Sequence, residues 1–353
     1  MAAPMAVAVF VMLSLMSAVA GAPRNDYRLE AANPVRPLPA PPLGINPLDD
    51  APNPPEPERV RLGRWLFYDT RLSADGTVSC ATCHVPERAF SNGRRVARGV
   101  GGHGGIRKTP SFINVAQAFV RNRFGWDGHA ASLEEQSLRP IVNPSEMGST
   151  ASRMVATLSR IAGYAPYFER AFGDARVTPQ RVASALADYQ RTRMSGNSAW
   201  DRWQSGDARA LSPSARRGWE LFTGDARCSR CHFGPNLTDR AFHSLGIGWD
   251  ATSKRYTDEG RGAITGRPAD RGAFKTPTLR DVARHPPYMH DGSLPTLRDV
   301  VLFYKRGGVK NPHLDTQIRP LRLSSTDVDA LVAFLEALNG EGFIDRVPSA
   351  FPK

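Results

Sequence analysis

The 353-residue chain has little cysteine: there are 4, and all of them lie in two Cys-x-x-Cys-His motifs. No cysteine follows the apolar N-terminal stretch, which argues against a lipoprotein anchor, and none is left over for a separate disulfide. The sequence also lacks long runs of alternating apolar and polar residues, which argues against a protein built mainly of β-sheet. Beyond residues 1–20, no stretch is long and apolar enough to cross a bilayer.

Residues 1–20 contain no charged side chain and end in the small-x-small pattern Ala18-Val19-Ala20. This pattern is typical of a secretory signal peptide cleaved near Ala20, although the usual basic residue before the apolar part is missing. An uncleaved membrane anchor is the alternative. We expect an exported soluble protein, most simply periplasmic, that is free of the membrane after cleavage.

Residues 21–57 are rich in proline and show little periodicity, so we expect an extended leader or linker outside the core. Helical signals dominate the remainder. Residues 132–135 have the pattern of a capping box, and 296–299 form a weaker version of it. Apolar residues fall at helical spacing over 328–338, and Gly340 follows as a helix stop.

Each Cys-x-x-Cys-His motif has the spacing that attaches one c-type haem. The two cysteines can form thioethers to the two vinyl groups of a haem, and the adjacent histidine then supplies a proximal nitrogen to the iron. A zinc site or a disulfide is the alternative, but export supports haem because c-type haem is attached outside the bacterial cytoplasm. The attachment residues are Cys80, Cys83 and His84 in the first motif and Cys228, Cys231 and His232 in the second.

Segments around the two motifs resemble each other and follow in the same order. The pairs are 63–67 with 218–222, 108–116 with 275–283, and 126–128 with 290–292. These repeats predict a mainly α fold with long loops, made of two cytochrome c-like haem domains related by internal duplication. We place the N-terminal domain at 58–200 and the C-terminal domain at 205–343.

Basic residues outnumber acidic ones, 46 to 34, and the formal net charge is +12. A basic surface can steer an acidic partner toward the protein. The alternative is a solvated surface with arginines paired to haem propionates. Export and the haem motifs argue against nucleic acid as a partner.

Two haems alone do not separate electron transfer from catalysis. An iron with strong ligands on both faces mainly passes electrons. An iron with an open face and a nearby acid–base group can activate peroxide, because that group takes the proton from the attacking oxygen and returns it to the leaving one. The residues on the distal side of each haem therefore decide the function.

Over residues 57–340 the chain resembles the bacterial di-haem cytochrome c peroxidases and their relative MauG. The resemblance rests on the ordered segments 62–67, 80–84, 124–128, 132–136, 143–147, 228–232 and 287–292. In that family the N-terminal haem is the peroxide site. The resemblance implies His84 as its proximal ligand and Glu146 as the distal acid–base group. It also implies that Gln136 helps to position peroxide and that Trp126 relays electrons between the haems, although Trp126 could serve core packing as well.

For the C-terminal haem the resemblance implies His232 as the proximal ligand. Ordinary peroxidases of the family use a methionine on the other face, MauG uses a tyrosine, and Tyr304 stands at that position here. Tyrosinate stabilises ferric iron more than a thioether does. The alternatives are Met289 as the ligand, or a role for Tyr304 as a buried core phenol.

Three positions depart from the family pattern. MauG carries a surface tryptophan two residues before its second haem motif, and this chain has Ala226 there. The family holds calcium between the haems with an asparagine side chain and a threonine carbonyl, where this chain has Lys108 and His285. Because an ammonium group cannot ligate calcium, we expect no calcium between the haems.

His103 lies in the glycine-rich loop 99–105. In many peroxidases of the family a loop histidine caps the peroxide haem in the oxidised state and leaves on activation. Glycines make such a loop movable. His103 is therefore a candidate removable ligand, although its spacing to Arg107 differs from the family's.

The leading hypothesis is a periplasmic di-haem peroxidase that reduces hydrogen peroxide to water with electrons from a small cytochrome c or cupredoxin. Electrons would enter at the C-terminal haem and pass to the N-terminal haem. One alternative, favoured by Tyr304, is MauG-like peroxide-dependent oxidation of a protein partner through a high-valent di-haem state. Another is a non-enzymatic di-haem electron carrier. The protein could act as a monomer or a homodimer.

Overall fold

The computed structural model describes residues 27–48, 53–117 and 123–353, so the segment expected to be a signal peptide lies outside the described residues. The fold is mainly α-helical, as the sequence predicts. The α-helices are α1 (Tyr27–Ala32), α2 (Pro57–Tyr68), α3 (Cys80–Cys83), α4 (Leu133–Val142), α5 (Ala151–Arg160), α6 (Ala165–Phe172), α7 (Pro179–Arg191), α8 (Ala199–Gln204), α9 (Pro213–Thr223), α10 (Arg261–Thr265), α11 (Leu297–Lys305) and α12 (Ser325–Glu336). The short 3-10 turns are η1 (Thr70–Leu72), η2 (Pro86–Arg88), η3 (Val100–Gly102), η4 (Val115–Gln117), η5 (Ala162–Tyr164), η6 (Cys228–Arg230), η7 (Pro268–Asp270) and η8 (Val282–Arg284).

The strands are short and form two antiparallel pairs. They are β1 (Phe242–Ser244) with β4 (Ala273–Lys275), and β2 (Trp249–Asp250) with β3 (Arg255–Tyr256). In the first pair Phe242 lies opposite Lys275. Helices and loops therefore build the core. None of the described helices is both long and apolar enough to cross a membrane.

A first lobe is built on α2 and α7, which pack against each other. Pro57 begins α2, where its missing N–H costs no hydrogen bond. Trp65 and Phe67 on α2 are buried in the core of this lobe. The two helices approach closely at Gly63, where a Cβ atom would collide with the carbonyl oxygen of Ala185 on α7.

A second lobe is built on α9 and α12, which pack in the same way. Ser324 starts α12 with a complete capping box. Gly218 lets α9 approach α12, since a Cβ atom there would collide with the carbonyl oxygen of Ala330. The rings of Phe222 and Phe334 lie 5.0 Å apart between the helices.

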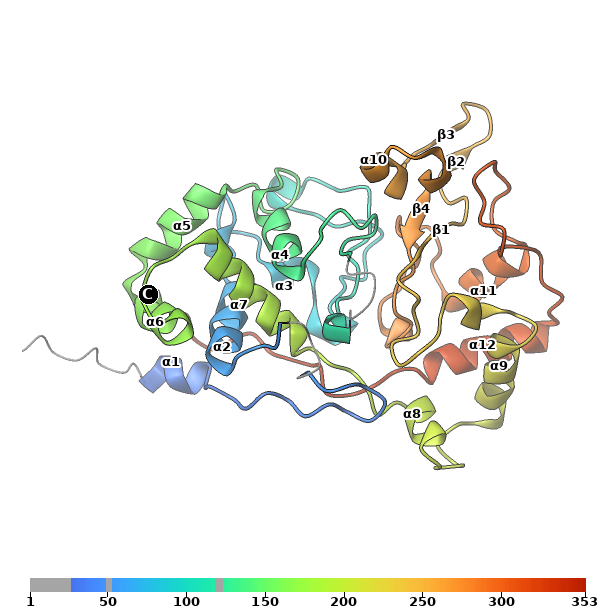
Figure 1. Cartoon of the computed structure of the whole chain (residues 1–353), viewed down its shortest axis with the longest axis horizontal. Helices are drawn as coiled ribbons and strands as arrows, with labels where there is room; N and C mark the ends of the chain where they lie inside the picture. Colours follow the sequence, from blue (N-terminus) through green and yellow to red (C-terminus); the bar gives the residue numbers. More distant parts are fainter. Residues whose placement is uncertain (1–26, 49–52, 118–122) are drawn as a thin grey trace, which may run out of the picture.

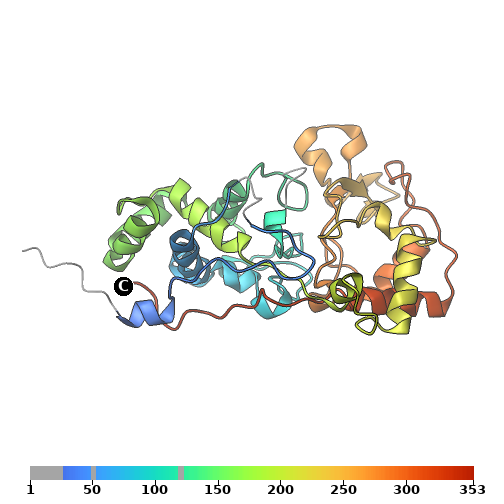
Figure 2. The ribbon, with the colours of Figure 1, turned by 60° about the horizontal axis from the view of Figure 1, so that its bottom comes forward.

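The two lobes lie side by side along the long axis of the molecule, with α2, α4 and α7 at one end and α9, α11 and α12 at the other (Figure 1). The strands and α10 belong to the end of the second lobe in both views (Figure 2). The loops that follow the two haem motifs meet in the region between the lobes, where residues of both halves line common cavities.

Part of the segment expected to be an extended leader belongs to the core. Leu29 on α1 is buried in the first lobe, and Ile45 and Leu48 are buried in a smaller cluster with η4 and the chain after α7. The prolines keep most of this segment free of regular structure, but the apolar side chains between them still gain from leaving water. The expectation of a segment outside the core is therefore wrong at Leu29, Ile45 and Leu48, while most of the segment between them is exposed.

The C-terminal tail returns from the second lobe to the first. Phe343 is fully buried in the first core. A carboxylate oxygen of Asp345 lies 2.8 Å from Nε of Arg64, and Trp65 Nε1 donates to the carbonyl oxygen of Ala350 at 3.0 Å. The chain consequently ends beside α6 (Figure 1). The first lobe thus includes residues far beyond the predicted domain 58–200.

Both predicted capping patterns begin helices. Ser132 Oγ accepts a hydrogen bond from the backbone N–H of Glu135 at 3.0 Å, but the Glu135 carboxylate accepts from the N–H of Ala131 instead of closing the box. Thr296 and Asp299 form a complete box at the start of α11. The weaker pattern is the complete one because the shorter carboxylate of Asp299 reaches the N-cap N–H at 3.1 Å.

Candidate functional site

The first Cys-x-x-Cys-His motif lies at the wall of a cavity in the first lobe. The short helix α3 carries both cysteines, and Cys80, Cys83 and His84 all line this first cavity. Nδ1 of His84 lies 2.7 Å from the carbonyl oxygen of Phe90. Because Nδ1 is engaged by the backbone, Nε2 is the nitrogen that remains for an iron.

The two residues expected on the distal side and the tryptophan expected between the haems line the same cavity. They are Trp126, Gln136 and Glu146. Gln136 lies on α4, Glu146 lies in the turn after α4, and Trp126 lies in the loop before it. The structure thus brings this trio together with the first motif, across more than sixty residues of chain from Cys80 to Glu146.

The carboxyl group of Glu146 has one hydrogen-bond donor, which we did not predict from the sequence. Asn143, the residue that ends α4, donates from Nδ2 to Glu146 Oε1 at 2.9 Å. Burial raises the pKa of Glu146, and the hydrogen bond from Asn143 opposes this effect. Glu146 can therefore hold a proton at higher pH than an exposed glutamate, as an acid–base group requires.

A chain of hydrogen-bonded polar side chains, which we did not predict from the sequence, fixes the position of Gln136. Nε2 of His129 lies 2.9 Å from Gln136 Oε1, and Nδ1 lies 2.5 Å from Asp127 Oδ1. Arg107 pairs with the other oxygen of Asp127 at 2.7 Å. Burial acts to raise the pKa of Asp127, but hydrogen bonds from His129 and Arg107 bring it below its usual range. In the sequence, the position of Asp127 and His129 close to Trp126 could have indicated that they belong to this site.

The second motif lines a second cavity in the second lobe. The short turn η6 begins at Cys228, and Cys228, Cys231 and His232 all face this cavity. Nδ1 of His232 lies 2.9 Å from the carbonyl oxygen of Leu237. Both histidines therefore use the same backbone contact to leave Nε2 available for iron.

Several side chains of the second cavity besides His232 are of types that bind iron. Tyr304 on α11 lines the cavity, and so do Met289 and His285. Burial raises the pKa of the Tyr304 phenol. Both ring nitrogens of His285 are buried and have no hydrogen-bond partner among the described residues. Ala226, at the position of the family's surface tryptophan, is buried and lines the same cavity.

Trp126 lines both cavities and is fixed from two sides. Its Nε1 donates to the carbonyl oxygen of Lys108 at 2.8 Å, and its own carbonyl accepts from the N–H of Lys275 at 2.8 Å. The indole therefore has the location that a relay between the two sites requires.

His103 is exposed and is not among the residues that line the first cavity. Its loop is nevertheless attached close to the distal residues, since the N–H of Val100 donates to the carbonyl oxygen of Glu146 at 2.7 Å. A role for His103 as a removable iron ligand would require this loop to move.

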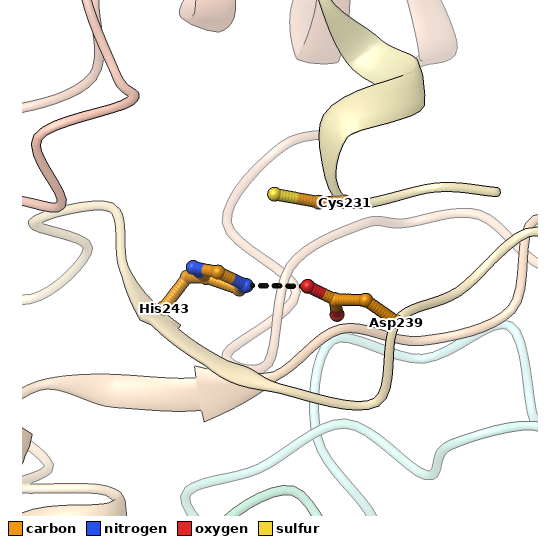
Figure 3. Close-up of side chains that lie close together, drawn as sticks. All are labelled: Cys231, Asp239 and His243. Atoms are coloured by element: carbon orange, nitrogen blue, oxygen red, sulfur yellow. Dashed lines mark hydrogen bonds and ion pairs between the residues drawn. The ribbon is translucent and has the colours of Figure 1, made fainter. Parts of the chain in front are cut away.

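Cys231, Asp239 and His243 lie close enough together to suggest a metal site (Figure 3). Nε2 of His243 lies 3.0 Å from Asp239, and Nδ1 lies 2.6 Å from Asp315. The hydrogen bond to Asp239 is the largest cause that raises the pKa of His243, and the hydrogen bond to Asp315 acts in the same direction. A protonated imidazole and a cysteine of the attachment motif do not make an independent metal site.

Two partly buried cations that have no carboxylate partner among the described residues favour an anionic group in the cavities. Arg240 lines the first cavity, Lys275 lines both, and neither has an ion pair within the described part of the chain. Burial lowers the pKa of Arg240 to about 10. Burial and the nearby Arg240 lower the pKa of Lys275 to about 7. Haem fits these features, because its propionates could pair with both cations and the two motifs supply its attachment.

Comparison with known proteins agrees with this chemistry. The family model described as di-haem cytochrome c peroxidase matches residues 57–209. Methylamine utilization protein MauG of Methylorubrum extorquens is 44% identical over 292 residues, which cover 82% of this chain and 80% of that protein. Cytochrome c peroxidase Ccp of Escherichia coli is 35% identical over 290 residues, which cover 81% of this chain and 59% of that protein.

Solved structures show the same similarity. A MauG-like protein associated with microbial copper homeostasis superposes with a TM-score of 0.76 at 33% identity, covering 88% of this chain and 96% of that one. The diheme peroxidase BthA from Burkholderia thailandensis superposes with a TM-score of 0.68 at 25% identity, covering 87% and 92%.

Proposed function

This chain belongs to the di-haem cytochrome c peroxidase and MauG family, and we propose that it reduces hydrogen peroxide to water in the periplasm. Family membership implies covalently bound haem c, and we assign one haem to each motif. When bound, these haems supply iron that binds peroxide and transfers electrons. A small cytochrome c or cupredoxin would supply the two electrons, and two protons complete the conversion of peroxide to two waters.

The observation that carries this proposal is the position of Glu146 in the same cavity as His84. Glu146 takes the proton from the incoming peroxide and returns it to the oxygen that leaves. Gln136, fixed by His129, orients the peroxide. Electrons enter at the His232 site and cross by Trp126, which lines both cavities.

The substitution Glu146→Gln tests the proposal. It removes the proton acceptor with little change of shape, so peroxide turnover should fall by about a hundredfold or more. Glu135→Gln is the matched control, because Glu135 is exposed on the preceding helix α4 and should leave turnover unchanged. Absorbance spectra should show both haems in both variants. Full turnover by Glu146→Gln with both haems bound would refute the assignment.

A second candidate is peroxide-dependent oxidation of a protein partner, favoured by Tyr304 in the second cavity and by the similarity to MauG. It predicts that peroxide converts the fully oxidised protein into a long-lived, more oxidised state, detectable by absorbance. Rapid consumption of reduced cytochrome c without that state would exclude this candidate. A plain electron carrier would instead show two low-spin haems by electron paramagnetic resonance and no reaction with peroxide.

A further inference from the structure

Lys108 is a buried lysine located between the two haem sites. Its side chain is 4% exposed, and it lines both the first and the second cavity. The backbone on either side is fixed, since its N–H donates to the carbonyl oxygen of His290 at 2.7 Å and its carbonyl accepts from Trp126 at 2.8 Å. The amino group therefore has a defined place in the region that separates the cavities.

The ammonium group of Lys108 has no anionic partner within the described residues. Nζ donates to Ser91 Oγ at 2.6 Å, and Ser91 in turn donates to the carbonyl oxygen of Thr109. The charge of Arg88, which is also positive, acts against the ammonium form. Burial and Arg88 lower the pKa of Lys108 to about 8, so the charged form still prevails at neutral pH. A buried, unpaired charge is costly, which calls for a functional reason.

The position of this charge places it beside both sites. Lys108 lines the first cavity together with His84, and it lines the second cavity together with His285. Because the residue is buried, its surroundings screen the charge less than water would. The charge therefore acts on cofactors bound in either cavity.

We propose that Lys108 is a positioning residue that supplies a fixed internal positive charge shared by the two haem sites and thereby raises the reduction potential of both haems. Reduction removes one positive charge from each iron, so a nearby cation favours the reduced state. The carbonyl oxygen of Lys108 also accepts the hydrogen bond from Trp126 Nε1. One residue thus carries the charge beside both sites and fixes the proposed relay between them. The proposal requires two bound haems and does not depend on peroxide turnover.

The test is the midpoint potential of each haem, measured by spectroelectrochemistry without peroxide. Lys108→Met removes the charge and keeps the length of the side chain. At a fixed applied potential it should lower the ratio of reduced to oxidised haem about three- to tenfold at both sites, where tenfold corresponds to ~59 mV. Lys108→Arg keeps the charge and should stay close to the wild type.

Lys254→Met is the matched control, because it removes a lysine charge from the exposed surface. It should change the ratio less than twofold at either haem. A shift in Lys108→Met no larger than in this control, or a shift at one haem alone, would overturn the proposal. If Lys108→Met fails to retain both haems, Lys108→Gln replaces it, since the amide can keep the hydrogen bond to Ser91 without the charge. Equal potentials in the Gln and Arg variants would then refute the shared charge.

Discussion

At the scale of single residues, burial and Asn143 act in opposite directions on the acidity of Glu146. The carboxylate is the form that accepts the proton of peroxide. A raised pKa therefore means that activity is lost at a higher pH, as the medium is acidified, than with an exposed glutamate. The Asn143 hydrogen bond favours the carboxylate and extends activity toward lower pH.

We accordingly predict that Asn143→Leu moves the acidic limb of the kcat/KM profile for peroxide to higher pH, because the variant loses the donor to Glu146 Oε1. The measurement is initial rate against pH in the wild type and the variant. Ser145→Ala, an exposed change in the same turn, serves as the control and should keep the wild-type limb. Superimposable limbs for Asn143→Leu and wild type would show that this hydrogen bond does not tune the group.

Sequence reasoning found the residues of the site that lie in recognisable motifs and missed the ones that support them. Glu146, Gln136 and Trp126 were predicted to share a site, and they line one cavity. Asn143 and His129 were missed, because a single amide or imidazole in a loop carries no periodic signal. Their contacts with Glu146 and Gln136 exist only after the chain folds.

At the scale of elements, each lobe contains a pair of helices that touch at a glycine. Gly63 lies against the carbonyl of Ala185 between α2 and α7, and Gly218 lies against that of Ala330 between α9 and α12. Both glycines belong to segments that repeat in the sequence. This correspondence supports the proposed internal duplication.

Gly218→Ala should destabilise the second lobe by about 1–3 kcal/mol, because the added methyl group forces α9 and α12 apart. The measurement is chemical unfolding of the haem-loaded protein. Gly105→Ala is the control, since a Cβ atom at that exposed position meets no close neighbour. Equal stability of the two variants would show that the helix contact tolerates a methyl group.

At the scale of the whole molecule, the C-terminal tail contributes to the core of the first lobe. Phe343 is fully buried near Phe90, whereas its neighbour Ile344 is 57% exposed. We predict that Phe343→Ala lowers the free energy of unfolding by about 3–5 kcal/mol. Ile344→Ala should change it by less than about 0.5 kcal/mol.

Chemical unfolding followed by tryptophan fluorescence can check this difference, because Trp65 in the first lobe donates to the tail at Ala350. A small effect of Phe343→Ala, comparable to that of Ile344→Ala, would mean that the tail packs without stabilising the lobe.

The helical character was predictable because apolar periodicity and capping residues act within a few neighbours. The packing of residues 27–48 and of the tail was not predictable in this way. The contact between Arg64 and Asp345 spans 281 residues. Nothing in the sequence around Leu29 indicates which distant residues it packs against. Proline content describes the local backbone and does not reveal which side chains become buried.

The return of the tail has a consequence for biogenesis. A chain made from its N-terminus delivers Phe343 among its last residues, yet Phe343 fills a place in the core that surrounds α2. The first lobe therefore cannot complete its folding when its own residues emerge, contrary to the usual domain-by-domain order. Cys80, which packs against this core, is consequently made long before the core is closed, and its thiol stays accessible until then.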